Sequence, residues 1–146
     1  HTALWGKAEK VLPQIAEKGI PIAFDYADKL EDPLVEATLP YVTYGFYSYH
    51  NGRNDKIEAF LKDKVARGMK VAIATFGEEG SLAWDGTQFY QEGIQKVKVV
   101  NTVGAGDSFI AGFLYGILNQ FPIDRCLKKG AEISASVVSV FEPWVE

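Results

Sequence analysis

Short apolar segments alternate with amphipathic segments of helical period over almost the whole chain, and this alternation limits the possible folds more than any other feature. The apolar segments predict strands at 1–5, 20–24, 41–49, 71–75, 81–84, 88–91 and 96–100. The amphipathic segments predict helices at 9–18, 33–39, 55–67, 105–118 and 127–141. Strands that alternate with helices form a mainly parallel sheet with helices on both faces. The sequence therefore predicts a three-layer α/β/α fold, in which ligands bind beyond the carboxyl ends of the strands.

Residues at the ends of these segments support the assignment. Asp32 is a good N-cap for the helix that follows it, and Pro33 suits the first turn of that helix. Gly68 follows the last apolar position of helix 55–67 and predicts its end. The pair Asp85-Gly86, between two strand-like segments, predicts a β-hairpin.

Composition indicates a globular protein and excludes several classes of function. The chain has 146 residues, which suggests one domain, and 47% of them are hydrophobic. Its net charge of −4, without runs of Lys and Arg, argues against nucleic-acid and membrane-surface binding. No apolar run reaches the roughly 18 residues that span a bilayer. The single cysteine, Cys126, excludes an internal disulfide and indicates a reducing, cytoplasmic location. We expect it to be a buried thiol rather than a nucleophile.

The segment before helix 105–118 contains the strongest candidate for a chemical site. Gly104 and Gly106 lack side chains, so that an anion can approach the backbone where the helix begins. The first N–H groups of a helix have no internal partner, and the helix dipole is positive at this end. Asp107 lies in the first turn, where its carboxylate can face the same anion and accept a proton. The alternative, that Asp107 only caps the helix, is less favoured because Thr102, both glycines and the pair Ala111-Gly112 accompany it. Ala111 and Gly112 are small, and we expect them to let this helix lie close to a neighbour.

The run Asn101-Thr102-Val103-Gly104-Ala105-Gly106-Asp107-Ser108-Phe109 resembles the C-terminal signature of the ribokinase-like (pfkB) carbohydrate kinases. The resemblance implies that Asp107 is the catalytic base. It also implies that the backbone N–H groups of Gly104, Ala105, Gly106 and Asp107 form the anion hole for the γ-phosphate of ATP. The family usually has Asp where this chain has Asn101, close to its metal and monovalent-cation environment. Asn keeps an acceptor oxygen but loses the charge.

A second segment, Thr75-Phe76-Gly77-Glu78-Glu79-Gly80-Ser81, resembles the family turn that contacts the nucleotide. Gly77 and Gly80 permit a positive φ and a close approach of the backbone. We therefore expect Thr75, Gly77 and Gly80 to bind nucleotide together with Thr102. An ordinary turn between a strand and a hairpin is the alternative for this segment.

Three further stretches narrow the resemblance to the fructoselysine 6-kinase group of this family: residues 23–29, 77–86 and 108–114. Within the first stretch, Asp25 follows a predicted strand. The resemblance places it in the vicinity of substrate or metal, whereas a carboxylate in a turn is the structural alternative. Many family members order Mg²⁺ with an Asn-x-x-Glu element, and this chain offers Asn51, Asn54 and Asp55 instead. Mg²⁺ accepts a water-rich shell with few protein ligands, but Asp55 could equally be the N-cap of helix 55–67.

The resemblance implies an ATP-dependent sugar kinase with ATP, Mg²⁺ and, where Asn101 allows it, a monovalent cation. The chain matches the C-terminal nucleotide-binding portion of such kinases over residues 1–146. The family's N-terminal half supplies most sugar contacts and a β-sheet lid that often forms a homodimer. We therefore expect the 146 residues alone to have little kinase activity. A family kinase for another sugar or a nucleoside, and a non-catalytic nucleotide-binding fragment, are the alternative functions.

Overall fold

The computed structural model describes residues 1–140, and contacts between residues divide the chain into two compact units. The first unit contains residues 1–77 and 82–89, and the second contains residues 78–81 and the chain from Tyr90 onward. Among the described residues, no helix is both long enough and apolar enough to cross a membrane.

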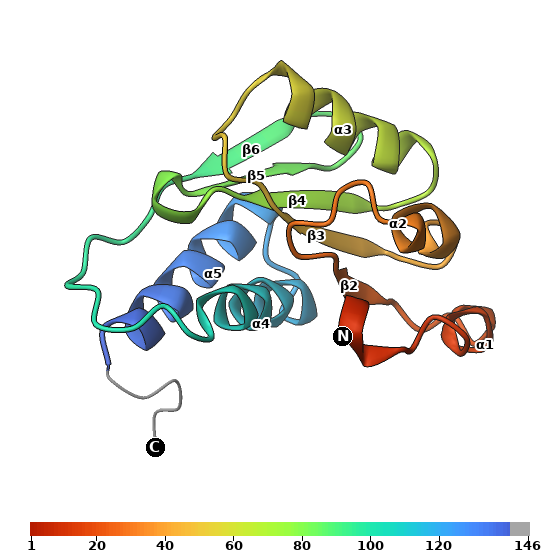
Figure 1. The fold of residues 1–146 in the computed structure, drawn as a ribbon, viewed down its shortest axis with the longest axis horizontal. Helices are drawn as coiled ribbons and strands as arrows, with labels where there is room; N and C mark the ends of the chain where they lie inside the picture. The colour runs from red at the N-terminus through yellow and green to blue at the C-terminus, as the bar shows by residue number, and fades with distance from the viewer. Residues whose placement is uncertain (141–146) are drawn as a thin grey trace. The chain divides into compact units, whose positions relative to one another are not determined.

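Six strands of the described chain form one sheet, in the order β1-β2-β3-β4-β5-β6 (Figure 1). They are β1 (Thr2–Ala3), β2 (Ala23–Asp25), β3 (Tyr44–Ser48), β4 (Val71–Thr75), β5 (Ser81–Trp84) and β6 (Phe89–Glu92). The pairs β1–β2, β2–β3 and β3–β4 are parallel, and the last pair is in register from Tyr44 opposite Val71 to Ser48 opposite Thr75. The predicted α/β fold with a mainly parallel sheet is confirmed.

Three helices belong to the first unit: α1 (Leu12–Glu17), α2 (Pro33–Thr38) and α3 (Asp55–Ala66). Each contributes buried side chains to one core cluster, which also contains strand residues. Asp32 caps α2 as predicted, since its carboxylate accepts a hydrogen bond from the Leu34 N–H at 2.9 Å. Gly68, at φ 137°, follows α3, again as predicted.

Aromatic rings stack through the centre of this core. The Tyr26 ring lies 4.4 Å from the Phe24 ring and 4.9 Å from the Tyr47 ring, measured between centroids. The Tyr26 hydroxyl shares a hydrogen bond of 2.6 Å with the hydroxyl of Thr38 on α2. Burial raises the pKa of Tyr26 to about 12, and burial also raises the pKa of Tyr47. The Tyr47 hydroxyl donates to the Met69 Sδ at 3.6 Å, so both tyrosines act as neutral packing residues with partnered hydroxyls.

The first residues of the chain differ from the prediction. The predicted strand 1–5 continues only to Ala3, because Leu4–Gly6 forms a 3-10 helix, η1. Helix 9–18 and strand 20–24 are also shorter than predicted. The sequence explains why α1 begins later than predicted. Pro13 suits a first helical turn, and it lacks the N–H that an interior position would need.

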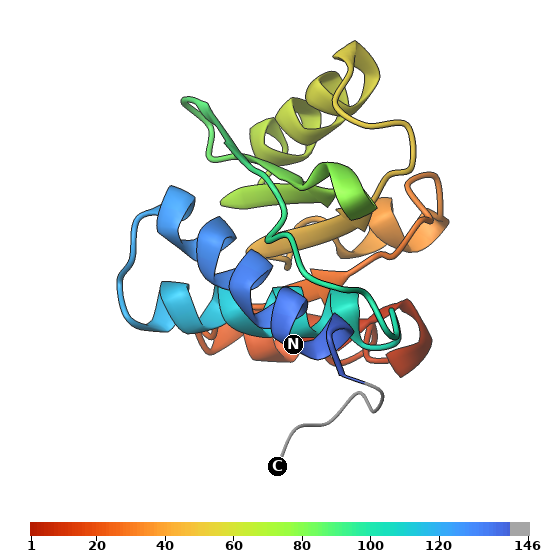
Figure 2. The same ribbon diagram turned by 90° about the vertical axis from the view of Figure 1, so that its left-hand side faces the viewer.

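The second unit contains two long helices, α4 (Ala105–Leu118) and α5 (Ile123–Val138), which run side by side (Figure 2). The bounds of α4 are those predicted. Helix α5 begins four residues earlier than predicted, directly after Pro122, and its predicted end at Phe141 lies outside the described residues. Gly112 allows the close packing of the two helices, because a Cβ there would lie 2.6 Å from the carbonyl oxygen of Lys129.

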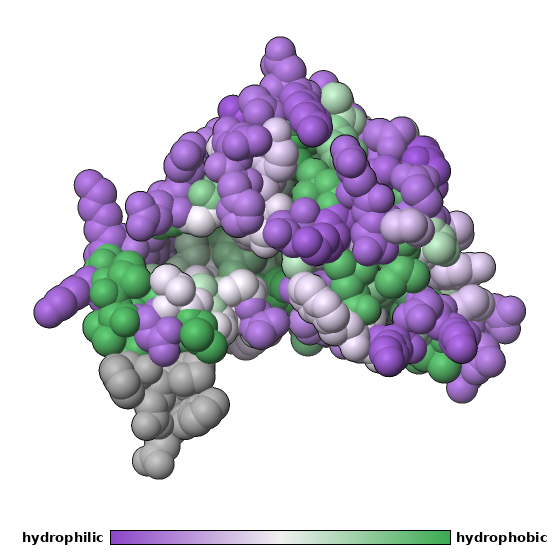
Figure 3. Space-filling view, in the orientation of Figure 1, coloured by the Kyte–Doolittle hydropathy of each residue, from purple (hydrophilic) through white to green (hydrophobic). Residues whose placement is uncertain are grey.

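The predicted strand 96–100 is wrong, because these residues are irregular and exposed. Their alternation of Lys and Val suits a strand, but a strand also needs a neighbour with which to exchange backbone hydrogen bonds. Within residues 1–140, backbone hydrogen bonds hold the end of this segment, where the N–H groups of Val100 and Asn101 donate to the carbonyl of Val138. Apolar side chains gather over the segment between β6 and α4 (Figure 3), and they include Val97, Val99, Val100 and Val103.

Candidate active site

The loop before α4 is a tight turn that needs a glycine at its last position. The side-chain oxygen of Asn101 accepts a hydrogen bond from the Val103 N–H at 3.0 Å, and this bond closes the turn. Gly104, the N-cap of α4, has φ 81° and ψ 0°. A residue with a Cβ is strained in this left-handed conformation. Gly104 is therefore required by the backbone itself, and Asn101 contributes to the shape of the loop.

Backbone hydrogen bonds at the start of α4 show which donors of this turn are already used. The Ala105 N–H donates to the Thr102 carbonyl at 3.2 Å, and the Ser108 N–H donates to the Gly104 carbonyl at 2.9 Å. In the described structure, the N–H groups of Gly106 and Asp107, which lie between them, have no acceptor. These two donors therefore point out of the first turn at the positive end of the helix dipole.

The space at this turn suits an anionic ligand, and the Asp107 carboxylate beside it can accept a proton. A Cβ added to Gly106 would meet nothing within 4 Å, so neither packing nor a positive φ explains the glycine. Asp107 is exposed and makes no ion pair with a described residue. The turn therefore combines two unused donors, room beside the backbone and an available carboxylate.

The prediction that Ala111 and Gly112 let α4 lie close to a neighbour is right for one residue of the pair. Gly112 and Gly116 of α4 pack against α5, and a Cβ at Gly116 would lie 2.7 Å from the Cys126 Sγ. From the other side, Gly130 of α5 packs against α4, where its Cβ would lie 2.8 Å from Phe109. Ala111 is exposed and takes no part in that contact. Cys126 is buried, and burial raises the pKa of its thiol to about 11. This supports its structural interpretation.

The second predicted glycine segment contains one conformational and one packing constraint. Gly77 follows β4, in the first unit, with φ 60° and no atom near its missing Cβ. Gly80 belongs to the second unit and has φ 93°, and a Cβ there would lie 2.1 Å from the carbonyl oxygen of Glu92. The carbonyl of Thr75 accepts a hydrogen bond from the Tyr49 N–H at 2.9 Å. The local fold therefore explains Gly80, whereas packing does not explain Gly77.

Asp25 ends β2 and shapes the turn that follows. Its Oδ1 accepts a hydrogen bond from the Ala27 N–H at 2.8 Å, and Ala27 has a positive φ of 49°. The side chain is half-buried. This contact is the one expected of a carboxylate in a turn at the end of a strand, and it places Asp25 at the carboxyl edge of the sheet.

An open pocket of about 600 Å³ lies in the first unit, beyond the carboxyl ends of β2 and β3. Residues 28–32, which follow β2, line one side, and Ser48 to Asn51 with Lys56 line another. Its charges are mixed, and the Lys29 ammonium lies 3.4 Å from the Asp28 carboxylate. Sequence reasoning identified Asn51 here but missed Lys29 and Lys56. For Lys29, the available signal was its position shortly after the end of a strand of a parallel sheet, whereas Lys56 lies in the first turn of α3 and had no such signal.

Of the three residues considered for Mg²⁺, Asn54 is engaged in the fold. Its Oδ1 accepts from the Ile57 N–H at 3.0 Å, and its Nδ2 donates to the Tyr49 hydroxyl at 3.1 Å. Asn54 is therefore the N-cap of α3, and the interpretation of Asp55 as that cap is wrong, since Asp55 is the first residue of the helix. Within residues 1–140, no group of three or more His, Cys, Asp or Glu side chains could hold a metal ion.

The predicted residues are distributed over both units. Asp25, Asn51, Asn54, Asp55, Thr75 and Gly77 belong to the first unit, whereas Gly80, Asn101, Thr102 and residues 104–107 belong to the second. Within the second unit, the structure brings Asn101, Thr102, Gly104, Gly106 and Asp107 together in one loop and helical turn.

Comparison with protein families and curated proteins identifies relatives over almost the whole chain. The pfkB family carbohydrate kinases match residues 3–143. The fructoselysine 6-kinase of Escherichia coli (strain K12) is 38% identical over 144 residues, which are 99% of this chain and 55% of that protein. The fructosamine kinase FrlD of Bacillus subtilis (strain 168) is 32% identical over 141 residues, which are 97% of this chain and 49% of that protein. The chain thus spans about half the length of the curated relatives that it matches.

Solved structures show the same fold at lower sequence identity. A microbiome-derived acarbose kinase, Mak1, matches 99% of this chain and 50% of its own with a TM-score of 0.85 and 22% identity. The ribokinase of Arabidopsis thaliana, solved with ribose and ATP, matches 90% of this chain and 46% of its own with a TM-score of 0.75 and 20% identity.

Proposed function

Because the chain belongs to the pfkB family of carbohydrate kinases, we propose that it supplies the nucleotide-binding part and the catalytic base of an ATP-dependent sugar kinase. The observation that carries the proposal is the first turn of α4, with its two unused N–H donors, the open space beside Gly106 and the exposed Asp107. Location in the cytoplasm is part of the proposal.

The open turn binds the γ-phosphate of ATP. Phosphoryl transfer builds negative charge on the equatorial oxygens of the transferred group, and fixed donors stabilise that charge without reorganisation. The N–H groups of Gly106 and Asp107 are the strongest candidates for these donors. Gly104 gives the turn its shape beside the phosphate, and the Ala105 N–H, which donates to the Thr102 carbonyl at 3.2 Å, is the remaining part of the proposed anion hole. Thr102 and the segment Thr75, Gly77 and Gly80 complete the proposed nucleotide contacts.

Asp107 acts as the general base. As the hydroxyl oxygen of the acceptor sugar forms a bond to the γ-phosphorus, the bond from that phosphorus to the ADP oxygen breaks, and the hydroxyl proton passes to the Asp107 carboxylate. ADP then leaves with the electron pair of the broken bond. Positioned general bases of this kind accelerate reactions by roughly 10²- to 10⁴-fold.

Mg²⁺ accompanies ATP in this proposal and, when bound, neutralises charge on the phosphates. The residues of the chain suit a water-rich ion with few protein ligands. Asn51 lines the pocket of the first unit and offers an amide oxygen, whereas Asn54 already caps α3. Asn101 offers no charge for a monovalent cation, and its Oδ1 already accepts a bond from Val103. Asn101 therefore gives no charge-based support for a monovalent cation at this position.

The proposed acceptor is the 6-hydroxyl of fructoselysine or a related fructosyl-amine. The support is the identity to two kinases of that substrate class over nearly all of the chain. A different sugar or a nucleoside is the alternative acceptor, because the matched region covers only about half of those kinases. A non-catalytic nucleotide-binding role is the alternative from another class.

A hybrid enzyme tests the proposal. The chain replaces the 144-residue stretch that it matches in the E. coli fructoselysine 6-kinase, and transfer of labelled phosphate from ATP to fructoselysine is measured. We expect phosphorylation by the hybrid and its loss in the Asp107→Asn variant. A folded hybrid that binds ATP but transfers no phosphate to any sugar would support the non-catalytic alternative. ATP-dependent transfer that survives Asp107→Asn would show that another group is the base.

A further inference from the structure

Helix α4 has a second apolar face, and α5 leaves much of it exposed. Ala111, Leu114, Tyr115 and Leu118 recur at positions i, i+3, i+4 and i+7, and such residues share one side of a helix. We call these four residues the α4 stripe. Leu118 is 83% exposed and Tyr115 is 52% exposed, while Ala111 is exposed and Leu114 is half-buried.

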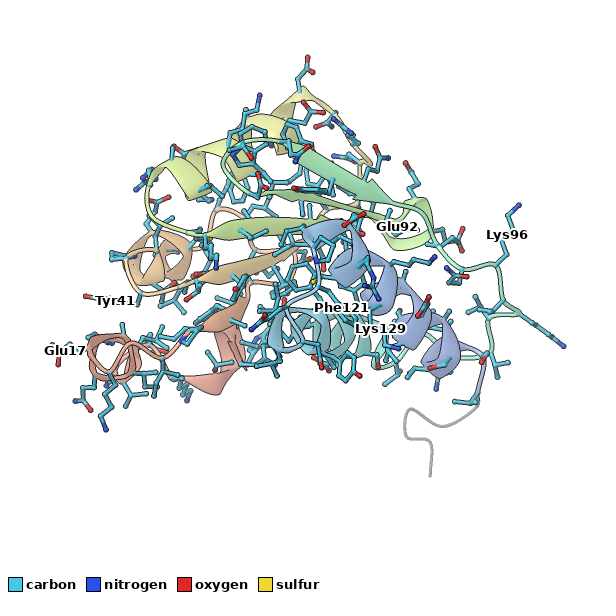
Figure 4. The ribbon with its side chains drawn as sticks, turned by 180° about the vertical axis from the view of Figure 1, so that it is seen from behind. Glu17, Tyr41, Glu92, Lys96, Phe121 and Lys129 are labelled. Carbon is cyan, nitrogen blue, oxygen red and sulfur yellow. The ribbon has the colours of Figure 1, made fainter. Side chains whose placement is uncertain are left out.

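The opposite side of the same helix is fully occupied. Phe109, Gly112, Phe113 and Gly116 are buried, and Gly112 and Gly116 meet α5 directly. Two neighbours contact the Tyr115 ring, namely the Phe121 ring at 6.2 Å between centroids and the Lys129 ammonium, which lies over the Tyr115 ring at 5.5 Å from its centroid. Phe121 and Lys129 are labelled in Figure 4. A helix that is apolar around its whole circumference is one that other elements cover on more than one side.

The stripe runs from the proposed catalytic turn along the helix. Asp107 lies four residues before Ala111 and therefore on the same side of α4. Whatever covers the stripe consequently lies beside the carboxylate that we propose as the base.

We infer that the α4 stripe is the docking surface for the part of the kinase chain that lies outside these 146 residues. The matched region is only 55% of the E. coli relative and 49% of the B. subtilis relative, so each relative has about as many residues again. A second copy of the chain is less suitable, because four residues on one helix offer far less than the roughly 800 Å² that each partner buries in a standard interface. The inference rests on family membership and not on the proposed reaction.

Cysteine labelling tests this inference. Leu118→Cys is placed in the stripe, and Lys128→Cys, at an exposed position of α5, is the matched control. Each is made in the 146-residue chain and in the E. coli hybrid, and the rate of alkylation by iodoacetamide is followed by peptide mass spectrometry. We expect Leu118→Cys to react at least about tenfold more slowly in the hybrid than in the 146-residue chain. In the hybrid, the covered cysteine becomes reactive only when the structure around it opens locally. Lys128→Cys should react at similar rates in both.

The native Cys126 reports folding within the same experiment, because it is buried and stays slow only while α4 and α5 are packed. If Cys126 is alkylated rapidly in the hybrid, α4 and α5 are not packed there. The labelling is then repeated in the intact E. coli kinase with cysteine at the position aligned with Leu118. Equal labelling of the stripe cysteine with and without the additional half would overturn the inference. Slow labelling in the 146-residue chain alone, together with a dimer in sedimentation, would assign the stripe to a second copy and also overturn it.

Discussion

The first turn and the middle of α4 use the same residue type for opposite purposes. Gly112, in the middle, is required by packing, because the carbonyl of Lys129 occupies the place of its side chain. Gly106, in the first turn, has nothing within 4 Å of its missing Cβ. The difference separates glycines that hold helices together from a glycine whose open space is available to a ligand. Gly80 and Gly77 differ in packing alone, because Glu92 occupies the place of the Gly80 Cβ and nothing lies near that of Gly77, whereas both have a positive φ.

The largest effect that we expect is on catalysis at the open turn. Asp107→Asn in the hybrid should lower kcat by roughly 10²- to 10⁴-fold, because the amide cannot accept the hydroxyl proton. Thermal unfolding should change little, since the carboxylate is exposed. The matched control is Asp124→Asn, which removes a carboxylate from the first turn of α5 and should leave kcat unchanged. Equal loss of activity in both variants would mean that first-turn charge, and not base catalysis, is responsible.

The next largest effect is on stability, in the middle of the helix. Gly112→Ala should lower the free energy of unfolding by about 1–3 kcal/mol, because the methyl group forces α4 and α5 apart. Gly106→Ala should raise it slightly or leave it unchanged, since Ala is favoured over Gly in helices by roughly 0.5–1 kcal/mol. Chemical denaturation of the 146-residue chain measures both. Destabilisation by Gly106→Ala as large as that by Gly112→Ala would remove the distinction between the two positions.

Sequence patterns predicted those elements whose local signals and packing agree. Helix α4 and strand β4 have their predicted bounds, since a glycine turn opens the first and a buried apolar run forms the second. The segment 96–100 was mispredicted because alternation reveals which face a strand would bury, but not whether a neighbouring strand exists. The exposed state of Ala111 was missed for a similar reason, since a small residue fits a close helix contact and an open face equally well.

At the candidate site, the sequence identified the residue types but not which of their atoms are already used. The motif gave four N–H donors from Gly104 to Asp107, and only the hydrogen bonds of the turn show that Ala105 is engaged. Similarly, Asn51 and Asn54 are equivalent as residue types. The structure distinguishes them, because the Asn54 side chain bonds both to the backbone of α3 and to Tyr49.

A smaller effect tests this distinction between the two asparagines. Asn54→Ala should lower the free energy of unfolding by about 1 kcal/mol through loss of the α3 cap. Asn51→Ala, at an exposed position, should have less effect on stability. In the hybrid, the Mg²⁺ concentration that gives half-maximal activity should move more in Asn51→Ala than in Asn54→Ala. The reverse order would return Asn54 to the metal site and assign its capping bonds a secondary role.

The smallest effect concerns ion pairs between α2 and α3, far in sequence from the open turn. Glu36 pairs with Arg67 and with the nearly buried Lys64, and these bonds lower the pKa of Glu36 from 4.5 to about 2. A folded-state pKa below the unfolded one means that the stabilisation is complete above about pH 4.5 and is lost as the pH falls toward 2. Because Glu36 is half exposed, solvent limits the effect to roughly 0.2–1 kcal/mol.

Glu36→Gln should therefore flatten the decline in stability between pH 5 and 2, measured by denaturation, whereas Glu31→Gln should preserve it. An unchanged slope in Glu36→Gln would assign the acid sensitivity to other carboxylates.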